Sequence, residues 1–351
     1  MKILPGFLLA LAIAFAGQFL STLIGVHWMG LPKSPVSAIM MAILLGIAVR
    51  NLLPLPAALD PGIRFGLVRV LRFGIVLLGI RLSLGEAGAI GLKSLPVIIG
   101  SAGAALLIVA HLARRMGMSG KLGTLIAVGT SICGATAIVA TAPAIAAKDT
   151  EVSYAVACIT LFGVIAMLVY PFAGHWIFHG DPFAAGLFLG TAVHETAQVA
   201  GAGLVYQEYY AEPAALDVAT VAKLVRNLGM LVVIPLMCVL YHRRHSDGGE
   251  RPAWYTMVPL FIVGFAAMSL LRTVGDLGDK PFGVMSVEQW QWFVAHTKDL
   301  AELSLGVAMA AVGLGTRLAD LVAIGLKPLA VGLFSALLVG AVSVSLISLL
   351  Y

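Results

Sequence analysis

Long apolar stretches dominate this chain and leave too few charged residues to cover a soluble domain. Hydrophobic residues make up 60% of the 351 residues and charged residues only 11%, whereas an ordinary soluble domain carries about 25% charged residues. Because a membrane-crossing helix needs about 20 consecutive apolar residues, most of the chain must lie in a lipid bilayer. We therefore expect an all-α polytopic membrane protein, with one transmembrane domain over residues 1–351.

The apolar runs number about eleven, and we expect each to form one transmembrane helix. They fall at 4–26, 35–50, 65–84, 94–113, 121–147, 152–178, 183–206, 216–242, 254–271, 298–318 and 328–350. The first run continues to Val26, which favours a spanning helix over a cleaved signal peptide. The one longer loop, 272–297, contains Trp290 and Trp292, which is typical of an interfacial helix.

Lysine and arginine residues are scattered singly through the short loops, which is typical of a topology signal rather than of a nucleic-acid site. With the N-terminus inside, thirteen of the 22 lie on the cytoplasmic side, seven lie outside, and Lys223 and Arg226 lie within a span. This bias predicts a cytoplasmic N-terminus and an outside C-terminus. The three cysteines fall within expected spans, so we expect no disulfide framework.

Two of the runs contain segments that a lipid-facing helix should not have. Residues 129–137 and 190–198 are rich in glycine, hydroxyl and small residues where leucine is expected. Broken helical backbone at membrane depth is tolerated only where protein or a water-filled cavity satisfies it. Paired interrupted helices of this kind are typical of the binding site of a solute transporter.

Internal similarities indicate inverted repeats, which we expect over about 35–178 and 183–350. The main similarity has an offset of seven spans, whereas repeats of five helices require an offset of five. Residues 79–82 and 90–95 resemble 315–318 and 324–329, and the eleven-span topology makes these copies run in opposite directions. The two interrupted segments also resemble each other. The same topology makes them run in the same direction, which an inverted repeat does not explain.

The first interrupted segment offers hydroxyl groups and free backbone N–H groups that suit an anion. The candidate ligands there are Thr130, Ser131, Cys133, Gly134 and Thr136. The alternative is close helix packing, because small residues let membrane helices approach each other.

The second interrupted segment carries His194 and Glu195, whose ionisable side chains at membrane depth indicate a solute path or a proton relay. We expect them, together with Gln198, to couple transport to a proton or another ion. A structural hydrogen-bonded pair is the alternative. The segment also begins like the zinc-protease pattern His-Glu-x-x-His, but Gln198 replaces the second histidine.

Lys223 and Arg226 lie three residues apart, so they share one helix face. If their span starts near Leu216, both face the protein interior and could bind a dianion, since arginine offers a planar fork to oxyanion oxygens. If the span starts near Asn227, both side chains reach the membrane interface instead.

At these residues the chain resembles a bacterial family of sulfate exporters, which are conserved polytopic inner-membrane proteins. The resemblance rests on residues 129–143, 159–163, 193–199 and 221–226, and it extends over essentially the whole chain. It implies a place in the cation–proton antiporter and anion transporter superfamily, with inverted five-helix repeats and interrupted helices. It supports a transporter far better than it supports sulfate as the solute.

We therefore expect a secondary transporter that exports a small anion, such as sulfate or a related sulfur oxyanion, with proton coupling. A sodium- or proton-coupled carrier of an organic acid is the main alternative, and an intramembrane metalloprotease is a remote one. The chain has no Gly-x-x-x-x-Gly-Lys-Ser/Thr motif, so gradients must supply the energy. We expect no cofactor, no metal and no nucleic-acid partner, and homo-oligomer formation stays open.

Overall fold

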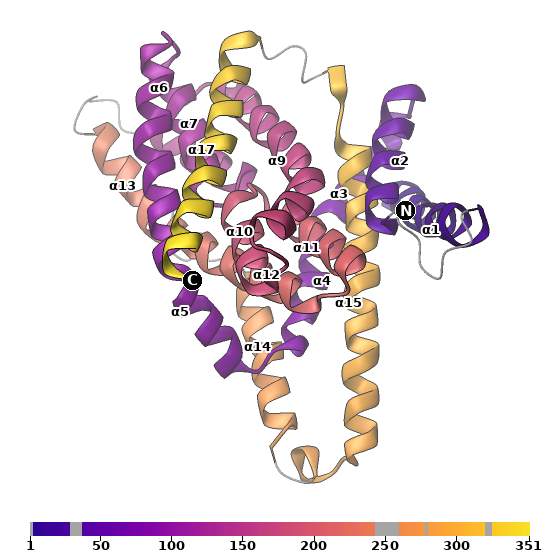
Figure 1. The fold of residues 1–351 in the computed structure, drawn as a ribbon. Helices are drawn as coiled ribbons and strands as arrows, with labels where there is room; N and C mark the ends of the chain where they lie inside the picture. Colours follow the sequence, from indigo (N-terminus) through magenta and orange to yellow (C-terminus); the bar gives the residue numbers. More distant parts are fainter. Residues whose placement is uncertain (1–2, 29–36, 243–259, 278–279, 320–324) are drawn as a thin grey trace. The chain divides into compact units, whose positions relative to one another are not determined.

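The computed structural model describes residues 3–28, 37–242, 260–277, 280–319 and 325–351, and these residues form helices and no strand (Figure 1). Five helices are long and apolar enough to cross a membrane: Leu4–Thr22, Leu84–Arg115, Asp149–Ile177, Pro213–Met237 and Leu326–Leu350. Three shorter apolar helices accompany them: Ala38–Leu52, Pro182–Ala192 and Leu260–Gly275. The all-α multi-pass class is thereby confirmed, whereas the expected number of about eleven spans is not, and the repeats stay predictions.

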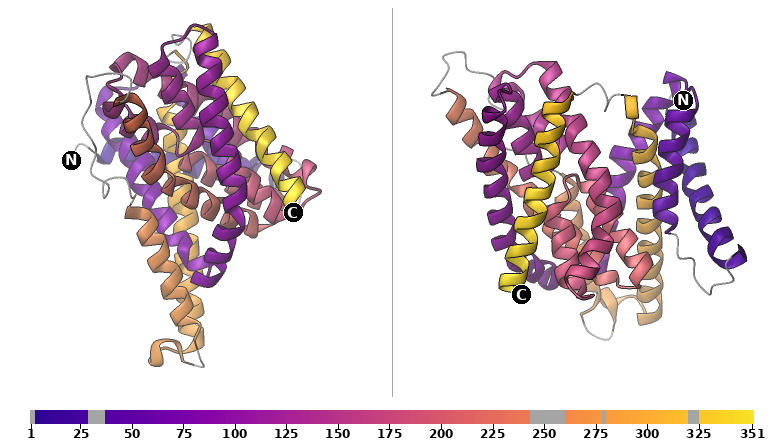
Figure 2. Two further views of the ribbon diagram at one scale, coloured as in Figure 1. Left: turned by 90° about the vertical axis from the view of Figure 1, so that its left-hand side faces the viewer. Right: turned by 45° about the horizontal axis from the view of Figure 1, so that its top comes forward.

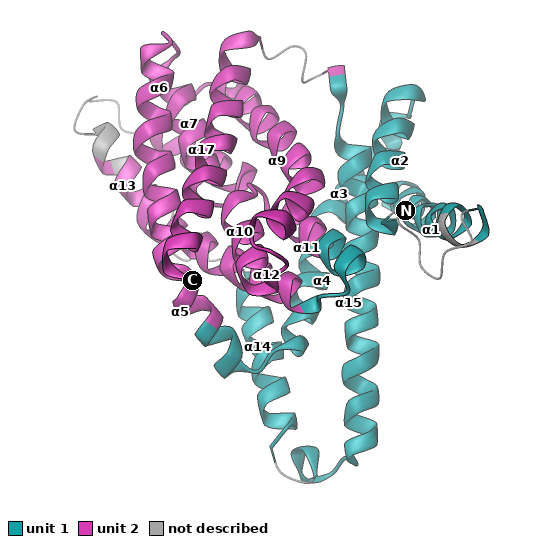
Figure 3. Cartoon of the chain, viewed as in Figure 1, with its two compact units in different colours: residues 1–89, 204–213, 260–318 teal, residues 90–203, 214–259, 319–351 magenta. Residues whose placement is uncertain are grey.

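The chain forms two compact units (Figure 3). Unit 1 comprises residues 1–89, 204–213 and 260–318, and unit 2 comprises 90–203, 214–259 and 319–351.

Unit 1 is built from α1 (Leu4–Thr22), η1 (Leu23–Trp28), α2 (Ala38–Leu52), η2 (Ala57–Leu59), α3 (Asp60–Phe65), η3 (Gly66–Val70), α4 (Leu71–Leu78), η4 (Gly79–Arg81), α14 (Leu260–Gly275), η8 (Pro281–Gly283) and α15 (Val287–Gly315). Its core lies where α1, α2 and α15 meet, around Ala10, Ala42 and Ala310. Small residues bring these helices close together, since a Cβ on Gly46 of α2 would lie 2.7 Å from the Ala310 carbonyl oxygen.

The start of α15 differs from the expected loop 272–297, because residues 287–297 are helical. Ser286 begins this helix with a capping box. Its hydroxyl accepts a hydrogen bond from the backbone N–H of Gln289 (3.2 Å), and the Gln289 side chain accepts one from the Ser286 N–H (3.0 Å). The helix expected around Trp290 and Trp292 is therefore present, and it continues without a break into the rest of α15.

Unit 2 is built from α5 (Leu84–Ala104, its first turn in unit 1), η5 (Ala105–Val109), α6 (Ala110–Arg115), α7 (Gly120–Ser131), α8 (Ala135–Thr141), η6 (Pro143–Ile145), α9 (Asp149–Ile177), α10 (Pro182–Ala192), α11 (Thr196–Tyr210, its end in unit 1), α12 (Pro213–Leu228), α13 (Met230–His242) and α17 (Leu326–Leu350). Helices α9 and α17 lie side by side (Figures 1 and 2). Exposed apolar side chains, such as Leu92, Ile99 and Leu107, cover the outer face of α5 and η5, as a lipid-facing surface requires.

Helices α7 and α8 with η6 form a hairpin, named here the first hairpin. Its two ends lie together, because Lys121 Nζ donates a hydrogen bond to the Ala146 carbonyl oxygen (2.5 Å) and Ser119 pairs with Glu151 at the start of α9. The run 121–147 therefore enters and leaves at the same end of unit 2. This corrects the expectation of one full crossing there, because the break after Ser131 turns the chain back.

Helices α10 and α11 form the second hairpin. Gly186 of α10 packs against Ala215 of α12, with its Cβ position 2.6 Å from that residue's carbonyl oxygen, and Gly203 of α11 packs against the adjacent Leu216. The two arms therefore flank the start of α12 at similar levels. The run 183–206 also turns back instead of crossing unit 2, because the helix breaks at Val193.

The two hairpins enter unit 2 from opposite ends. Helix α9 begins beside the base of the first hairpin and ends beside the base of the second, where Gly174 packs against Phe188. The two interrupted segments consequently run in opposite directions. The eleven-span topology had made them run in the same direction.

Candidate functional site

The site forms where the tips of the two hairpins meet. Helix α7 ends at Ser131, and Ile132 then leaves the helical region with φ −123° and ψ −100°. Helix α10 ends at Ala192, and Val193 is extended with φ −79° and ψ 141°. Each break leaves carbonyl oxygens without helical partners, and the C-terminal end of a helix also carries partial negative charge. Two groups of buried acceptors therefore face the interior of unit 2.

Lys223 of α12 bridges both breaks. Its Nζ donates hydrogen bonds to the carbonyl oxygens of Ile132 (3.0 Å), Val193 (3.2 Å) and His194. An ammonium group has three donors, so these contacts use all of them.

Arg226, one turn further along α12, bridges the same two breaks. Its Nε donates to the Ser131 carbonyl oxygen (2.9 Å), and its Nη2 donates to that of Thr130. Its Nη1 donates to the carbonyl oxygens of Thr191 (2.6 Å) and Val193 (3.3 Å). Four of the five guanidinium donors are thus engaged.

Both cations are buried, with 0% of Lys223 and 1% of Arg226 exposed. They lie within α12, which begins at Pro213, and not at its start. The geometry therefore matches the interior position that the sequence left open and does not match side chains reaching the interface. In this arrangement both cations stabilise the breaks by direct contact with the backbone.

Glu195 contacts α9 and the start of α8. Its carboxylate accepts a hydrogen bond from the Thr160 hydroxyl of α9 (3.1 Å) and meets the backbone N–H of Ala135 at the start of α8. Gln198 holds the neighbouring backbone, because its side chain accepts from the Glu195 N–H (3.1 Å) and donates to the Thr160 carbonyl oxygen (3.2 Å). Glu195 and Gln198 therefore form one network with α9.

Gly134 lets the carboxyl group approach the first hairpin. Its φ of 75° favours glycine, and a Cβ there would lie 2.4 Å from Glu195 Cγ. The sequence predicted that Gly134 binds an anion through its backbone. In the structure, the missing side chain of Gly134 leaves room for the side chain of Glu195.

His194 is fully buried, and neither of its ring nitrogens has a hydrogen-bond partner among the described residues. Nearby, Asn227 donates to the Thr196 hydroxyl (3.2 Å), while its Oδ1 also lacks a described partner. Unsatisfied buried polar atoms are uncommon and require an explanation. These atoms belong to His194, just before α11, and to Asn227 of α12, and they are the polar groups of the site that the described residues leave unpaired.

The hydroxyl and thiol candidates of the first hairpin have other partners or positions. Thr130 Oγ1 donates to Ser335 Oγ (3.2 Å), and Ser131 Oγ donates to the Ala127 carbonyl oxygen (2.5 Å). Cys133 Sγ lies 3.3 Å from Met230 Sδ, and Thr136 is exposed on α8. The structure thus brings together Lys223, Arg226, His194, Glu195, Gln198 and the backbone of 130–134.

Thr160 was not among the sequence candidates. Its hydroxyl holds Glu195 and its carbonyl oxygen holds Gln198. The available signal was a threonine beside Gly163 in an otherwise apolar run, at residues 159–163.

Two opposed hairpins that meet on buried charged residues define a multi-pass membrane protein with an internal polar site. The family model described as conserved hypothetical protein 698 matches residues 5–332, and this chain belongs to that family. Similar relatives are bacterial proteins named UPF0324 membrane proteins.

Three of these relatives illustrate the sequence identity and the share of each chain that is covered. The Fusobacterium nucleatum protein FN0533 is 33% identical over 348 residues, covering 97% of this chain and 95% of its own. A Streptococcus pneumoniae protein is 34% identical over 287 residues, covering 82% of each chain. A Nitratidesulfovibrio vulgaris protein is 29% identical over 335 residues, covering 92% of this chain and 87% of its own.

Proposed function

We propose that this protein is a secondary transporter of a small anion, with sulfate and related sulfur oxyanions as the first solutes to test. The observation that carries the proposal is the meeting of two opposed hairpins on Lys223 and Arg226 inside unit 2. Non-helical backbone at membrane depth occurs where it lines a cavity or is buried in protein. In transporters, such interrupted helices form the solute and ion sites.

The charge of the cluster favours an anion. Two buried cations, Lys223 and Arg226, stand against one carboxylate, Glu195, which leaves an excess of one positive charge when all three are ionised. Because the cations already bind backbone carbonyl groups, they attract the anion by their field and not as its main ligands. The His194 ring and the free N–H groups of the first turn of α11 are the groups that remain to contact it.

Glu195 is the proposed carrier of the coupling proton. Its protonation raises the excess charge of the cluster from one to two, which matches a doubly charged oxyanion. Binding of the proton and of the anion would then favour each other, and a proton gradient could drive the anion. His194 contributes a second titratable group next to this carboxylate.

The test uses purified protein in liposomes, with radiolabelled sulfate, thiosulfate and sulfite as solutes. We expect counterflow of at least one oxyanion and acceleration by an imposed pH gradient. Glu195→Gln should keep counterflow but lose the response to the pH gradient. Glu212→Gln removes an exposed carboxylate outside the site and should behave as wild type. Absence of flux for every oxyanion, or an intact pH response in Glu195→Gln, would contradict the proposal.

A sodium-coupled carrier of an organic acid is the second candidate. The Glu195 carboxylate and the Thr160 hydroxyl place oxygen atoms side by side, and oxygen ligands suit hard cations. Carboxylate uptake that requires sodium in the same liposomes, without oxyanion flux, would favour this candidate. Tightly bound zinc in the purified protein would instead revive the metalloprotease alternative.

A further inference from the structure

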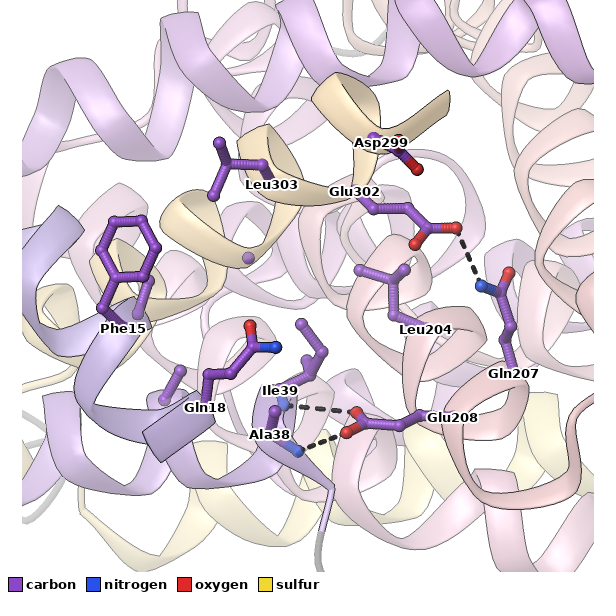
Figure 4. Close-up of a pocket in the computed structure, with 13 residues that line it drawn as sticks. Phe15, Gln18, Ala38, Ile39, Leu204, Gln207, Glu208, Asp299, Glu302 and Leu303 are labelled. Atoms are coloured by element: carbon purple, nitrogen blue, oxygen red, sulfur yellow. Dashed lines mark hydrogen bonds between the residues drawn. The ribbon is translucent and has the colours of Figure 1, made fainter. Parts of the chain in front are cut away.

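Unit 1 contains a cavity of about 460 Å³ that shares no residue with the site in unit 2 (Figure 4). Its walls come from α1, α2, the end of α11 and α15. Small-molecule sites commonly have volumes of about 300–1,000 Å³, so this cavity has room for a small organic ligand.

Part of its polar lining is fixed by the protein itself. The Glu208 carboxylate accepts hydrogen bonds from the Ser37 hydroxyl (2.6 Å) and from the Ala38 N–H (2.6 Å), and so caps the start of α2. Glu302 accepts one from Gln207 (2.9 Å) and pairs with Arg81 (3.1 Å). These contacts hold two carboxylates in place on opposite walls of the cavity (Figure 4).

Other polar groups of the lining remain available. Within the described residues, neither the Asp299 carboxylate nor the Gln18 carboxamide has a hydrogen-bond partner, and both belong to the cavity wall. Asp299 lies on α15, three residues before Glu302, so the two carboxylates share one face of the helix. The cavity therefore presents acceptor groups that contacts within the protein hold in place, and some of these groups have no hydrogen-bond partner among the described residues.

The charge and the apolar residues of the cavity wall indicate what kind of ligand fits the cavity. Among the described residues that line the cavity there is no lysine or arginine, while Phe15, Leu204 and Leu303 supply apolar wall. Three carboxylates stand against one arginine, Arg81, which pairs with Glu302, so the net charge around the cavity is negative. The carboxylates lie on two separate walls, and no group of three acidic, histidine or cysteine residues in the described ranges is close enough to hold a metal ion. A cation with an apolar body of several carbon atoms fits this combination better than a metal ion does.

We propose that this cavity binds an alkylammonium group, with the ammonium beside Asp299 and Glu302 and the apolar body against Phe15 and Leu303. The ammonium would donate to the free Asp299 carboxylate, and the Gln18 carboxamide oxygen would accept a further hydrogen bond. The same chemistry occurs in free organic amines and in the headgroup of phosphatidylethanolamine. The site is independent of the anion pathway, so it stands whether or not that proposal holds.

The binding test uses the full-length protein in nanodiscs of phosphatidylglycerol, and three probes of equal length: hexylammonium, hexanol and hexanoate. We expect calorimetric binding of hexylammonium, weaker binding of hexanol and none of hexanoate. Asp299→Asn should weaken hexylammonium binding roughly threefold to fivefold, since a partly solvated ion pair contributes up to about 1 kcal/mol. Glu288→Gln, which removes an exposed carboxylate from the same helix outside the cavity, should leave it unchanged.

A second arm distinguishes the two sources of the ligand. Adding phosphatidylethanolamine to the nanodiscs should weaken hexylammonium binding if the lipid headgroup occupies the cavity, and should have no effect if the ligand is a free amine. Equal binding of hexylammonium and hexanoate would overturn the proposal. An Asp299→Asn variant that is folded, with an unchanged melting temperature, and binds hexylammonium like wild type would overturn it as well.

Discussion

At the scale of single residues, two side chains of α12 donate hydrogen bonds to the backbone carbonyl groups that the helix breaks in both hairpins leave unpaired. Lys223 and Arg226 together contact carbonyl oxygens from residue 130 to 132 and from residue 191 to 194. Each contact places a positive charge at the negative end of a helix. Without the two cations, both helix interruptions would bury carbonyl groups that lack hydrogen-bond partners.

Arg226→Gln should strongly destabilise the protein. The substitution removes a buried cation that donates to carbonyl groups of both hairpins, and each buried acceptor left unsatisfied costs about 1–3 kcal/mol. We expect a large fall in the melting temperature of the detergent-solubilised protein. Arg114→Gln is the matched control, because Arg114 is exposed and, among the described residues, donates only to a carbonyl group of its own helix. Equal melting temperatures for the two variants would show that Arg226 does not hold the hairpin tips.

At the scale of elements, the positions of the breaks could be predicted but the reversal of the chain could not. Clustered glycine and hydroxyl residues located both interruptions within a few residues of where α7 and α10 end. The turn back depends on contacts between distant segments, such as Lys121 with Ala146 and Gly186 with Ala215. Apolar length alone does not distinguish a hairpin from a crossing, because both bury the same residue types.

The same reason limits the prediction of the site. His194, Glu195, Lys223 and Arg226 were identified because charge is costly in an apolar run. Which atoms they contact was not predictable, since the acceptors are mostly backbone carbonyl groups whose exposure depends on the break geometry. Thr160 was missed because a threonine in a membrane helix most often bonds only within its own helix.

We base a second prediction on the packing of α9 against the second hairpin. Gly163 lies against Gln198, and a Cβ there would fall 1.9 Å from Gln198 Oε1. Gly163→Ala should therefore displace the side chain that holds Glu195, at a cost of about 1–3 kcal/mol. Gly103→Ala is the matched control, because Gly103 is also helical and has no atom within 4 Å of its Cβ position. A fall in melting temperature is expected only for Gly163→Ala, and indistinguishable variants would contradict this packing.

At the scale of the whole molecule, the hairpins strengthen the topology predicted from positive charge. Because the two ends of the first hairpin lie together, the orientation predicted from positive charge now puts Lys148 on the cytoplasmic side and not outside. The distribution of Lys and Arg changes from thirteen and seven to fourteen and six. The predicted orientation, with the N-terminus inside and the C-terminus outside, stays the same, since two hairpins remove two crossings. The revised distribution agrees better with the positive-inside rule, on which this predicted orientation rests.

Cysteine labelling in spheroplasts can test this topology directly, starting from a variant whose three native cysteines are replaced. The two topologies disagree about Lys148 and His179. The hairpins place residue 148 inside with Arg115, and residue 179 outside with Lys93, whereas eleven crossings would exchange the two. All four side chains are exposed or partly exposed, so a membrane-impermeant maleimide should react with cysteine at 93 and 179 and spare cysteine at 115 and 148 until the cells are lysed. Labelling of residue 148 in intact spheroplasts, with 179 protected, would restore the full crossings and remove the basis for a site between opposed hairpins.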